Sequence, residues 1–248
     1  MATPSEETGP GASTDHMGRR LSAAVVRSLV DLIVSGDFAE GDLLPPEGPL
    51  SERFGVSRTV IREVAKRLEE KGLVIVAQGR GTQVARSGSW NMLDPVVLSA
   101  LIDNDRSLSV LDDLTVVRGT LEAVMASAVA SNHTPAELSR IEHALDTMRE
   151  MQHESDVFRQ ADAVFHLTIM ELSRNRLAAN IARNLYGRAQ ASNRFQGMMY
   201  PGAFESTLEA HARVVNAIRD GDAVAAEAAM REHIFDAWQH RRFESDDD

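Results

Sequence analysis

The stretch LPPEGPLSERFGVSRTVIREVAKRLEEKGLVIVAQGRGTQV, residues 44–84, decides the fold of the first part of the chain. Its prolines exclude a helix at the very start, and a short helix is expected over residues 49–54. Gly55 suits the left-handed residue of a tight turn. Ser57 is a favoured N-cap for a second helix over residues 57–71, which Gly72 ends. The stretch therefore predicts two helices joined by a tight turn.

A small hairpin is expected directly after the second helix. Residues 73–77 are apolar and β-branched, and residues 82–85 return as a partner strand. The four residues between them, Gln78-Gly79-Arg80-Gly81, form a glycine-rich turn with an arginine at its tip. Two helices followed by such a hairpin make a winged helix-turn-helix.

The second helix is amphipathic. At 100° per residue its apolar side chains fall within one arc: Val60, Ile61, Val64, Ala65 and Leu68. Arg58 and Arg62 lie on the opposite face, with Thr59 nearby. Such a face is either solvated or contacts the major groove of duplex DNA, where arginine reads guanine. The turn, the wing and the charge distribution together favour DNA binding.

The charge of the chain is unevenly distributed. The formal net charge is −11, which by itself argues against nucleic acid. Residues 18–86, however, contain 11 Lys and Arg against 9 Asp and Glu, whereas residues 87–248 contain 15 against 25. Local charge governs contact with phosphates, so the basic surplus lies where DNA binding is expected.

On either side of this stretch the pattern is simpler. Residues 1–17 are rich in Gly, Pro, Ser, Thr and Glu without periodicity, so we expect a disordered tail. Residues 20–35 have helical apolar spacing, with Ser22 as a possible cap and Gly36 as the stop. The winged domain is assigned to residues 18–86. Residues 87–106 are expected to be a linker and a short helix that begins near Asp94-Pro95.

The remainder, residues 107–243, is predicted to be an all-helical domain, so the fold class is mainly α. Expected helices cover residues 108–131, 134–151, 155–172, 175–195, 204–219 and 222–242. Six long helices joined by short loops are typical of a helical bundle. Thr134 and Glu137 are placed as a capping box at the start of the second helix.

Composition excludes several classes of function. The chain has no cysteine, which rules out disulfides, thiolate metal sites and cysteine nucleophiles. No apolar run reaches the roughly 18 residues of a membrane span, and the first residues lack the apolar core of a signal peptide. We therefore expect a cytoplasmic protein without membrane contact.

Four residues of the helical domain form a candidate metal site. Asp162 and His166 are four residues apart, so they share one helix face. His211 is ten residues before Gly221 and His233 twelve after it, so an antiparallel hairpin places them at nearly equal height. Three imidazoles and one carboxylate suit a divalent transition metal. The alternative is three unrelated histidines and a common Asp–His pair.

The opening stretch resembles the winged helix-turn-helix of GntR-family transcriptional regulators over about residues 18–86. In that family, arginines at the positions of Arg58 and Arg62 contact operator DNA. The resemblance extends this interface to Gln78 and the wing-tip residues Gly79, Arg80 and Gly81, and Thr59 joins it by its position near the two arginines on the helix. The family pattern L-P-x-E-R-x-L has an arginine where this chain has Gly48. One contact is therefore missing, and weaker or altered operator binding is expected.

Residues 108–240 resemble the all-helical ligand-binding domain, called FCD, of the FadR-like subfamily. Its metal-binding version carries D-x-x-x-H on one helix and one histidine on each of the last two helices, which Asp162, His166, His211 and His233 match. The resemblance implies a metal, with zinc preferred and nickel or manganese open, that anchors a small carboxylate effector. Residues 90–95 (WNMLDP) resemble the linker of relatives that sense sugar acids such as gluconate or galactonate.

Two further residues are candidates for the effector site. Arg118 matches an arginine that points into the FCD pocket and can pair with a carboxylate. Its alternative is a surface pair with Glu122, four residues later. Asn175 occupies a position where relatives keep an asparagine, and a helix cap is favoured there over a ligand contact.

The leading hypothesis is a homodimeric regulator, expected to be a repressor, that binds an inverted repeat and responds to a small organic acid. It is not expected to be an enzyme. Three alternatives stay open: a metalloenzyme using the Asp/His site, a sensor of the metal itself, and a structural metal in a regulator whose effector binds elsewhere.

Overall fold

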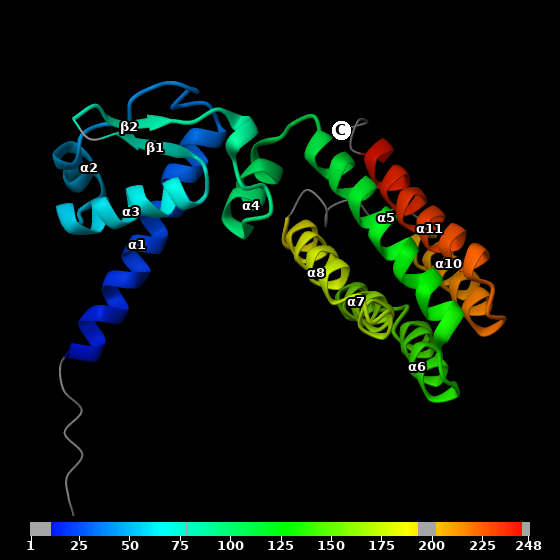
Figure 1. The fold of residues 1–248 in the computed structure, drawn as a ribbon. Helices are drawn as coiled ribbons and strands as arrows, with labels where there is room; N and C mark the ends of the chain where they lie inside the picture. The colour runs from blue at the N-terminus through cyan, green and yellow to red at the C-terminus, as the bar shows by residue number, and fades with distance from the viewer. Residues whose placement is uncertain (1–10, 78, 193–201, 245–248) are drawn as a thin grey trace, which may run out of the picture. The chain divides into compact units, whose positions relative to one another are not determined.

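The computed structural model describes residues 11–77, 79–192 and 202–244. The chain forms two compact units that divide between Asn104 and Asp105. Both units are drawn in Figure 1.

The first unit is a helical domain with one small hairpin. Its elements are α1 (Gly11–Val34), α2 (Glu47–Phe54), α3 (Arg58–Glu70), β1 (Val74–Ala77), β2 (Gly81–Val84), a 3₁₀ turn (Ser87–Ser89) and α4 (Pro95–Asn104). The two strands are antiparallel, with Val74 opposite Val84 and Ala77 opposite Gly81.

The turn between α2 and α3 forms as the sequence predicts. Gly55 adopts a left-handed conformation with φ of 63°, which a side chain would strain. The Ser57 hydroxyl accepts a hydrogen bond from the Val60 amide and caps α3. Leu29, Ile61 and Leu68 are almost fully buried between the helices and hold α1 and α3 together. The winged helix-turn-helix is thereby confirmed.

The first helix differs from the prediction. α1 begins at Gly11, eleven residues before the expected cap, Ser22, which is buried inside the helix. Residues 11–17 are therefore helical, although they were expected to belong to a disordered tail; residues 1–10 lie outside the described part. Once the packed part of α1 has formed, each added residue gains a hydrogen bond without a new nucleation cost. No proline interrupts the helix after residue 10.

The segment expected to be a linker is firmly bound to the first unit. The Trp90 indole donates to the Ala85 carbonyl at 3.2 Å, and the Asn91 amide donates to the Lys71 carbonyl at 2.9 Å. On α4, Val97 and Ala100 are buried in the same core as α1 and α3. The short helix after Asp94 thus forms, but as part of the first unit.

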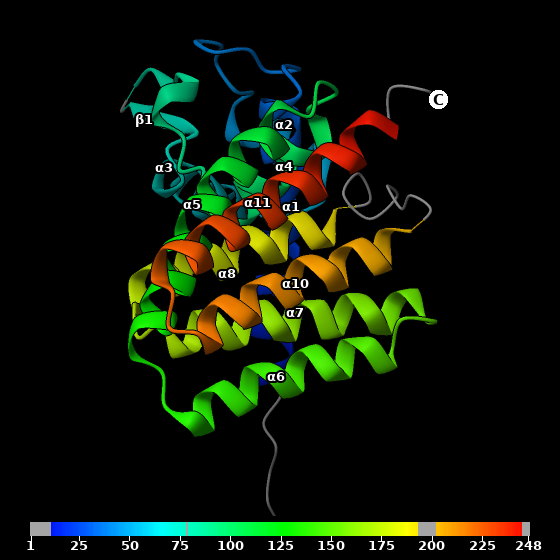
Figure 2. The same cartoon turned by 90° about the vertical axis from the view of Figure 1, so that its right-hand side faces the viewer.

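The second unit contains six described helices, and no strand occurs in its described residues. They are α5 (Ser109–Asn132), α6 (Pro135–Glu150), α7 (Ser155–Leu172), α8 (Arg176–Ala191), α10 (Ala203–Arg219) and α11 (Ala223–Glu244). α11 lies along α5 and α10, and α6 lies along α7 (Figure 2). The predicted bundle is confirmed, including the capping box of Thr134 and Glu137. The last residues of the helix predicted over residues 175–195, residues 193–195, lie outside the described part.

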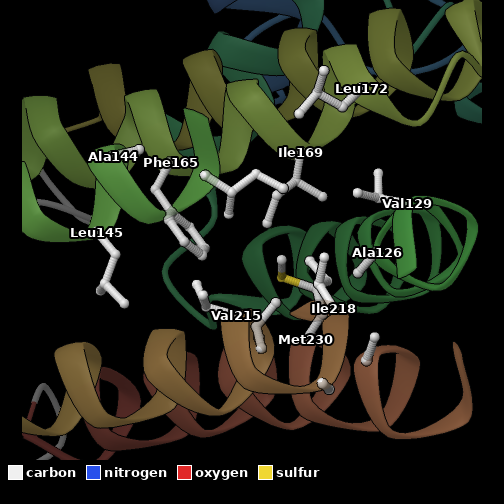
Figure 3. Close-up of a cluster of buried hydrophobic side chains, with 14 of the residues drawn as sticks. Ala126, Val129, Ala144, Leu145, Phe165, Ile169, Leu172, Val215, Ile218 and Met230 are labelled. Atoms are coloured by element: carbon white, nitrogen blue, oxygen red, sulfur yellow. The ribbon is translucent and has the colours of Figure 1, made fainter. Parts of the chain in front are cut away.

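The bundle is held together by apolar side chains that several helices contribute. Phe165 and Ile169 of α7 face Val215 and Ile218 of α10 across this core (Figure 3). All four are at most 1% exposed. Burial of one such side chain contributes about 1.5–3 kcal/mol to folding, so this core fixes the relative positions of the helices that carry the metal-site residues.

α5 is the one described helix that is long and apolar enough to cross a membrane by length and composition. In the structure, 56% of its most apolar window is buried within the bundle. Its apolar residues therefore belong to the protein core, and its composition is weak support for a membrane span.

Candidate metal centre and nucleic-acid interface

The four predicted metal ligands meet at one point inside the bundle. Asp162 and His166 come from α7, His211 from α10 and His233 from α11. One ligand atom from each lies within 4.8 Å of every other. The three histidines are at most 5% exposed, whereas Asp162 is only half-buried. Tertiary packing thus brings together residues up to 71 positions apart.

The distances between the ligand atoms fit a single metal ion. The Nε2 atoms of His211 and His233 are 2.9 Å apart, and each is 3.3 Å from Nε2 of His166. Oδ1 of Asp162 lies 3.5 Å from Nε2 of His211. Ligands about 2.1 Å from an ion lie roughly 3.0 Å apart at right angles and roughly 3.4 Å apart in a tetrahedron. The donor set and its spacing therefore fit a divalent transition metal.

A buried carboxylate orients one of the imidazoles. Glu122 of α5 contacts Nδ1 of His166 through Oε2 at 2.6 Å, and both side chains are 2% exposed. An ionised carboxylate only accepts hydrogen bonds, so Nδ1 carries the proton and Nε2 keeps its lone pair for a metal. Burial raises the pKa of Glu122, but the charges of Arg118 and His166 and its hydrogen bonds with both lower it to about 2.

The other two imidazoles are held in their neutral form. Burial lowers the pKa of His211 to about 3, although Asp162 opposes this shift. Burial, reinforced by the charges of His211 and His166, lowers the pKa of His233 well below its usual range. Neutral imidazole is the form that binds a metal, so the site loses no protons from these two groups when a metal enters near pH 7.

Asp162 is positioned by a tyrosine. Tyr186 of α8 donates from its hydroxyl to Oδ2 of Asp162 at 2.6 Å, which leaves Oδ1 directed at the histidines. Burial raises the pKa of Asp162, yet the charges of His166 and His211 and this hydrogen bond hold it below its usual range. Asp162 is therefore an anionic oxygen ligand at neutral pH.

Arg118 links these two supports. Its Nε donates to Oε1 of Glu122 at 2.7 Å, and its guanidinium lies over the Tyr186 ring, 4.2 Å from the centroid. The pair with Glu122 was one of the two predictions for Arg118, but it is buried and not on the surface. Arg118 and Glu122 are 6% and 1% exposed.

A cavity of about 70 Å³ opens beside the metal ligands. Asp162 and His233 form one part of its wall, and Arg118 and Tyr186 form another. Its remaining lining residues are mostly polar or cationic: Thr115, Arg159, Gln190, Thr207, Ile234, Ala237, Trp238 and Arg241. The cavity can therefore take a small anion that contacts both the metal site and Arg118.

The structure places Asn175 elsewhere. Its Oδ1 accepts from the Ala178 amide at 3.1 Å and caps α8, as the sequence favoured. Asn175 is exposed and is not among the residues that line the cavity.

Glu122 and Tyr186 were not predicted as site residues. The signal for Glu122 was an acidic residue four positions after Arg118 within an apolar helix.

The predicted DNA-binding residues lie on exposed surfaces of the first unit. Arg58, Thr59 and Arg62 are exposed on α3, and Gly79, Arg80 and Gly81 are exposed at the wing. Gln78 lies outside the described residues. A groove of about 950 Å³ separates α3 from the wing, and Arg62, Lys66 and Arg80 are among the residues that line it.

The sequence of each unit matches a known family. Residues 21–84 match the bacterial regulatory proteins of the gntR family, and residues 113–236 match the FCD domain. The galactonate operon transcriptional repressor of Escherichia coli is 31% identical over 205 residues, which cover 83% of this chain and 90% of that protein.

Other relatives agree with these matches. An Escherichia coli protein named after the L-lactate dehydrogenase operon that it is taken to regulate is 30% identical, covering 92% of this chain and 89% of its own. The HTH-type transcriptional regulator LutR of Bacillus subtilis is 29% identical, covering 82% and 93%. Among solved structures, Lar of Listeria monocytogenes shares the fold with a TM-score of 0.57 at 15% identity, over 89% of this chain and 96% of that one. The chain therefore belongs to the GntR family of transcriptional regulators, and its second unit is an FCD domain.

Proposed function

We propose that this regulator is a homodimeric repressor, acting in the cytoplasm, whose affinity for its operator is controlled by a small organic acid. The acid binds at a divalent transition metal, with zinc preferred and nickel or manganese as alternatives. One observation carries the proposal: the same small cavity is lined by Asp162 and His233 and by the cationic Arg118.

The chemistry of the cavity favours a 2-hydroxy acid. A divalent metal there would supply a Lewis-acidic centre for the carboxylate and the neighbouring hydroxyl oxygen. Arg118 would supply charge-assisted hydrogen bonds to the carboxylate. Galactonate and lactate, the acids in the names of two relatives, are both 2-hydroxy acids. A sugar acid therefore leads the candidates, with shorter hydroxy acids next. Asn175 is a weaker effector candidate than Arg118, because its side chain caps α8 and it does not line the cavity.

In this proposal α3 enters the major groove of each half-site. Arg58, Thr59 and Arg62 contact bases and phosphates there. The wing tip, formed by Gln78, Gly79, Arg80 and Gly81, approaches the neighbouring minor groove. An isologous dimer would present two such units to an inverted repeat. The support is the exposed basic face of α3 and its position beside the wing.

The acid can act as a signal only if it binds two conformations with different affinity. The test is a titration of a DNA duplex, first selected from a random pool by the purified protein, in the presence of sugar acids, shorter hydroxy acids and dicarboxylates. Each titration is run with metal-loaded and with chelated protein. We expect one 2-hydroxy acid to weaken DNA binding in the metal-loaded protein only.

The other outcomes separate the alternatives. No shift with any acid would refute the small-molecule switch. Release of DNA by the metal alone would identify a metal sensor. Turnover of an acid by the pure protein would identify an enzyme. Sedimentation of the free protein as a monomer at micromolar concentration would refute the homodimer.

A further inference from the structure

An acidic side chain lies between the two arginines that are proposed to read DNA. Glu47, the first residue of α2, accepts hydrogen bonds from Nε of Arg62 at 2.8 and 2.9 Å, one to each carboxylate oxygen. The charge of Arg58 also acts on this carboxylate and helps to lower its pKa, after the larger effect of its hydrogen bond with Arg62. The pair is solvent-exposed, with side-chain exposures of 70% for Arg62 and 42% for Glu47.

Stability does not account for this arrangement. Exposed ion pairs contribute little to folding, because water screens the charges and both side chains lose freedom. A carboxylate on a DNA-binding face also repels phosphates and weakens sequence-independent binding. Glu47 therefore weakens binding to DNA, and its contribution to folding is limited to a small, solvent-screened interaction with the N-terminus of α2. Its position beside Arg62 points to an effect on the contacts that Arg62 makes with DNA.

The geometry of the pair leaves the terminal nitrogens of Arg62 available for contact with a base. Among the described residues, the hydrogen bonds of the Arg62 guanidinium are made by Nε alone. Its two terminal nitrogens, Nη1 and Nη2, are the groups that contact O6 and N7 of guanine. A guanidinium fixed at Nε loses less freedom when it pairs with a base.

The neighbouring residue of α2 supports the second arginine. A Cβ atom built on Gly48 would lie 3.7 Å from Nη2 of Arg58, so the guanidinium of Arg58 lies over this glycine. The first turn of α2 thus lies near both α3 arginines: Glu47 is hydrogen-bonded to Arg62, and the guanidinium of Arg58 lies close to Gly48.

We propose that Glu47 is a specificity-determining residue, which positions Arg62 for a base and discourages contact with phosphates alone. The inference rests on the proposed DNA-binding face. It predicts that Glu47 lowers sequence-independent affinity and raises the ratio of specific to non-specific affinity.

The experiment compares four proteins: wild type, Glu47→Gln, Arg62→Ala and the double variant. For each, the dissociation constant is measured on the selected operator and on a scrambled duplex at several salt concentrations. In Glu47→Gln we expect tighter binding to scrambled DNA and a loss of about tenfold in the affinity ratio. In the Arg62→Ala background, Glu47→Gln should still tighten binding to scrambled DNA but leave the ratio unchanged.

Glu63→Gln is the matched control. Glu63 is also exposed and also pairs with an arginine of α3, Arg67, at 2.5 Å four residues away. It should shift both affinities in parallel and keep their ratio. Circular dichroism of each variant checks that the first unit remains folded.

Three results would overturn the inference. An unchanged ratio in Glu47→Gln would make Glu47 a simple surface charge. An equal change of the ratio in the Arg62→Ala background would show that Glu47 does not act through Arg62. A higher ratio would show that Glu47 competes with DNA for Arg62. If Arg58→Ala and Arg62→Ala both leave operator affinity unchanged, the proposed DNA face itself fails.

Discussion

The two units contain the same ion pair in opposite surroundings. Arg62–Glu47 in the first unit and Arg118–Glu122 in the second have nearly equal separations, 2.8 and 2.7 Å. The first pair is largely solvent-exposed, whereas the side chains of the second are 7% and 2% exposed. In water the charges of the first pair are screened, so the pair contributes little to stability and leaves the terminal nitrogens of Arg62 available to DNA. In the bundle neither charge can be left alone, so that pair is part of the structure around the candidate metal site.

The largest difference between the two pairs is expected in the stability that is lost when each glutamate is replaced. Glu122→Leu should lower the free energy of unfolding by about 3–5 kcal/mol, because Arg118 would keep a buried charge without its partner. Glu47→Gln should leave it unchanged within error. Urea denaturation of both variants measures the difference.

The matching control removes both buried charges. Arg118→Met combined with Glu122→Leu should recover most of the lost stability, since neither charge is then buried alone. If the double variant is as unstable as Glu122→Leu, the lost hydrogen bond between Glu122 and His166 or the changed packing of α5, and not the ion pair, explains the loss.

A second prediction concerns the metal, which only the buried site should bind. Zinc at about one hundred times its dissociation constant should stabilise the folded protein by about 2.7 kcal/mol, and a chelator should reverse this. His211→Ala should abolish the effect, whereas His143→Ala, at an exposed histidine of α6, should not. Thermal unfolding with and without zinc measures both. Equal stabilisation of the two variants would show that zinc binds elsewhere.

A third prediction concerns pH in the metal-free protein. The pKa values of His211 and His233 lie below the 6.5 of an unfolded chain, so the unfolded state binds more protons below pH 6.5. The contribution of these two histidines to stability is then fully present above pH 6.5. It is lost as the pH falls toward their pKa values in the folded state. Each histidine contributes a slope of about 1.4 kcal/mol per pH unit.

Urea denaturation in chelator between pH 7 and 5 tests this slope. His211→Asn should reduce the slope, and His143→Asn should leave it as it is. A flat profile in the wild type would mean that the buried imidazoles bind protons as readily as exposed ones.

The smallest effect, a change in operator binding, is expected at Gly48, which lies next to Glu47 of the exposed pair. Gly48→Arg should increase the salt dependence of operator binding by about one phosphate contact, a change of roughly 0.9 in the logarithmic slope. The new side chain would start 3.7 Å from the Arg58 guanidinium, so like-charge repulsion should keep the gain in affinity small. Fluorescence anisotropy at several salt concentrations measures both quantities. An unchanged slope would refute the missing contact.

The site could be predicted from the sequence to different depths in the two units. Helical spacing and equal distances to a turn made Asp162, His166, His211 and His233 candidate ligands, because both are local geometry. The resemblance to the metal-binding FCD domain then favoured this set over unrelated histidines. Glu122 and Tyr186 could not be predicted in the same way. They lie on α5 and α8, and nothing local shows that these helices face α7 at that height.

The linker illustrates the same limit. Residues 87–106 were assigned by their composition to a linker and a short helix. Whether α4 joins the core with Leu29 and Leu68 depends on contacts that form only after α1 and α3 have packed. The start of α1 at Gly11 is a similar case, since helix propagation depends on a packed nucleus further along the chain.

What the sequence by itself determined is what local chemistry controls: Gly55 and Ser57 set the helix-turn-helix, Thr134 set a helix start, and the apolar periodicity set the bundle. Only the tertiary structure decided how deeply each charge is buried. Burial changes the effective dielectric around a charge, and that quantity depends on every neighbouring helix at once. The same Arg–Glu pair is therefore a poised surface contact at Glu47 and a fixed support of a metal ligand at Glu122.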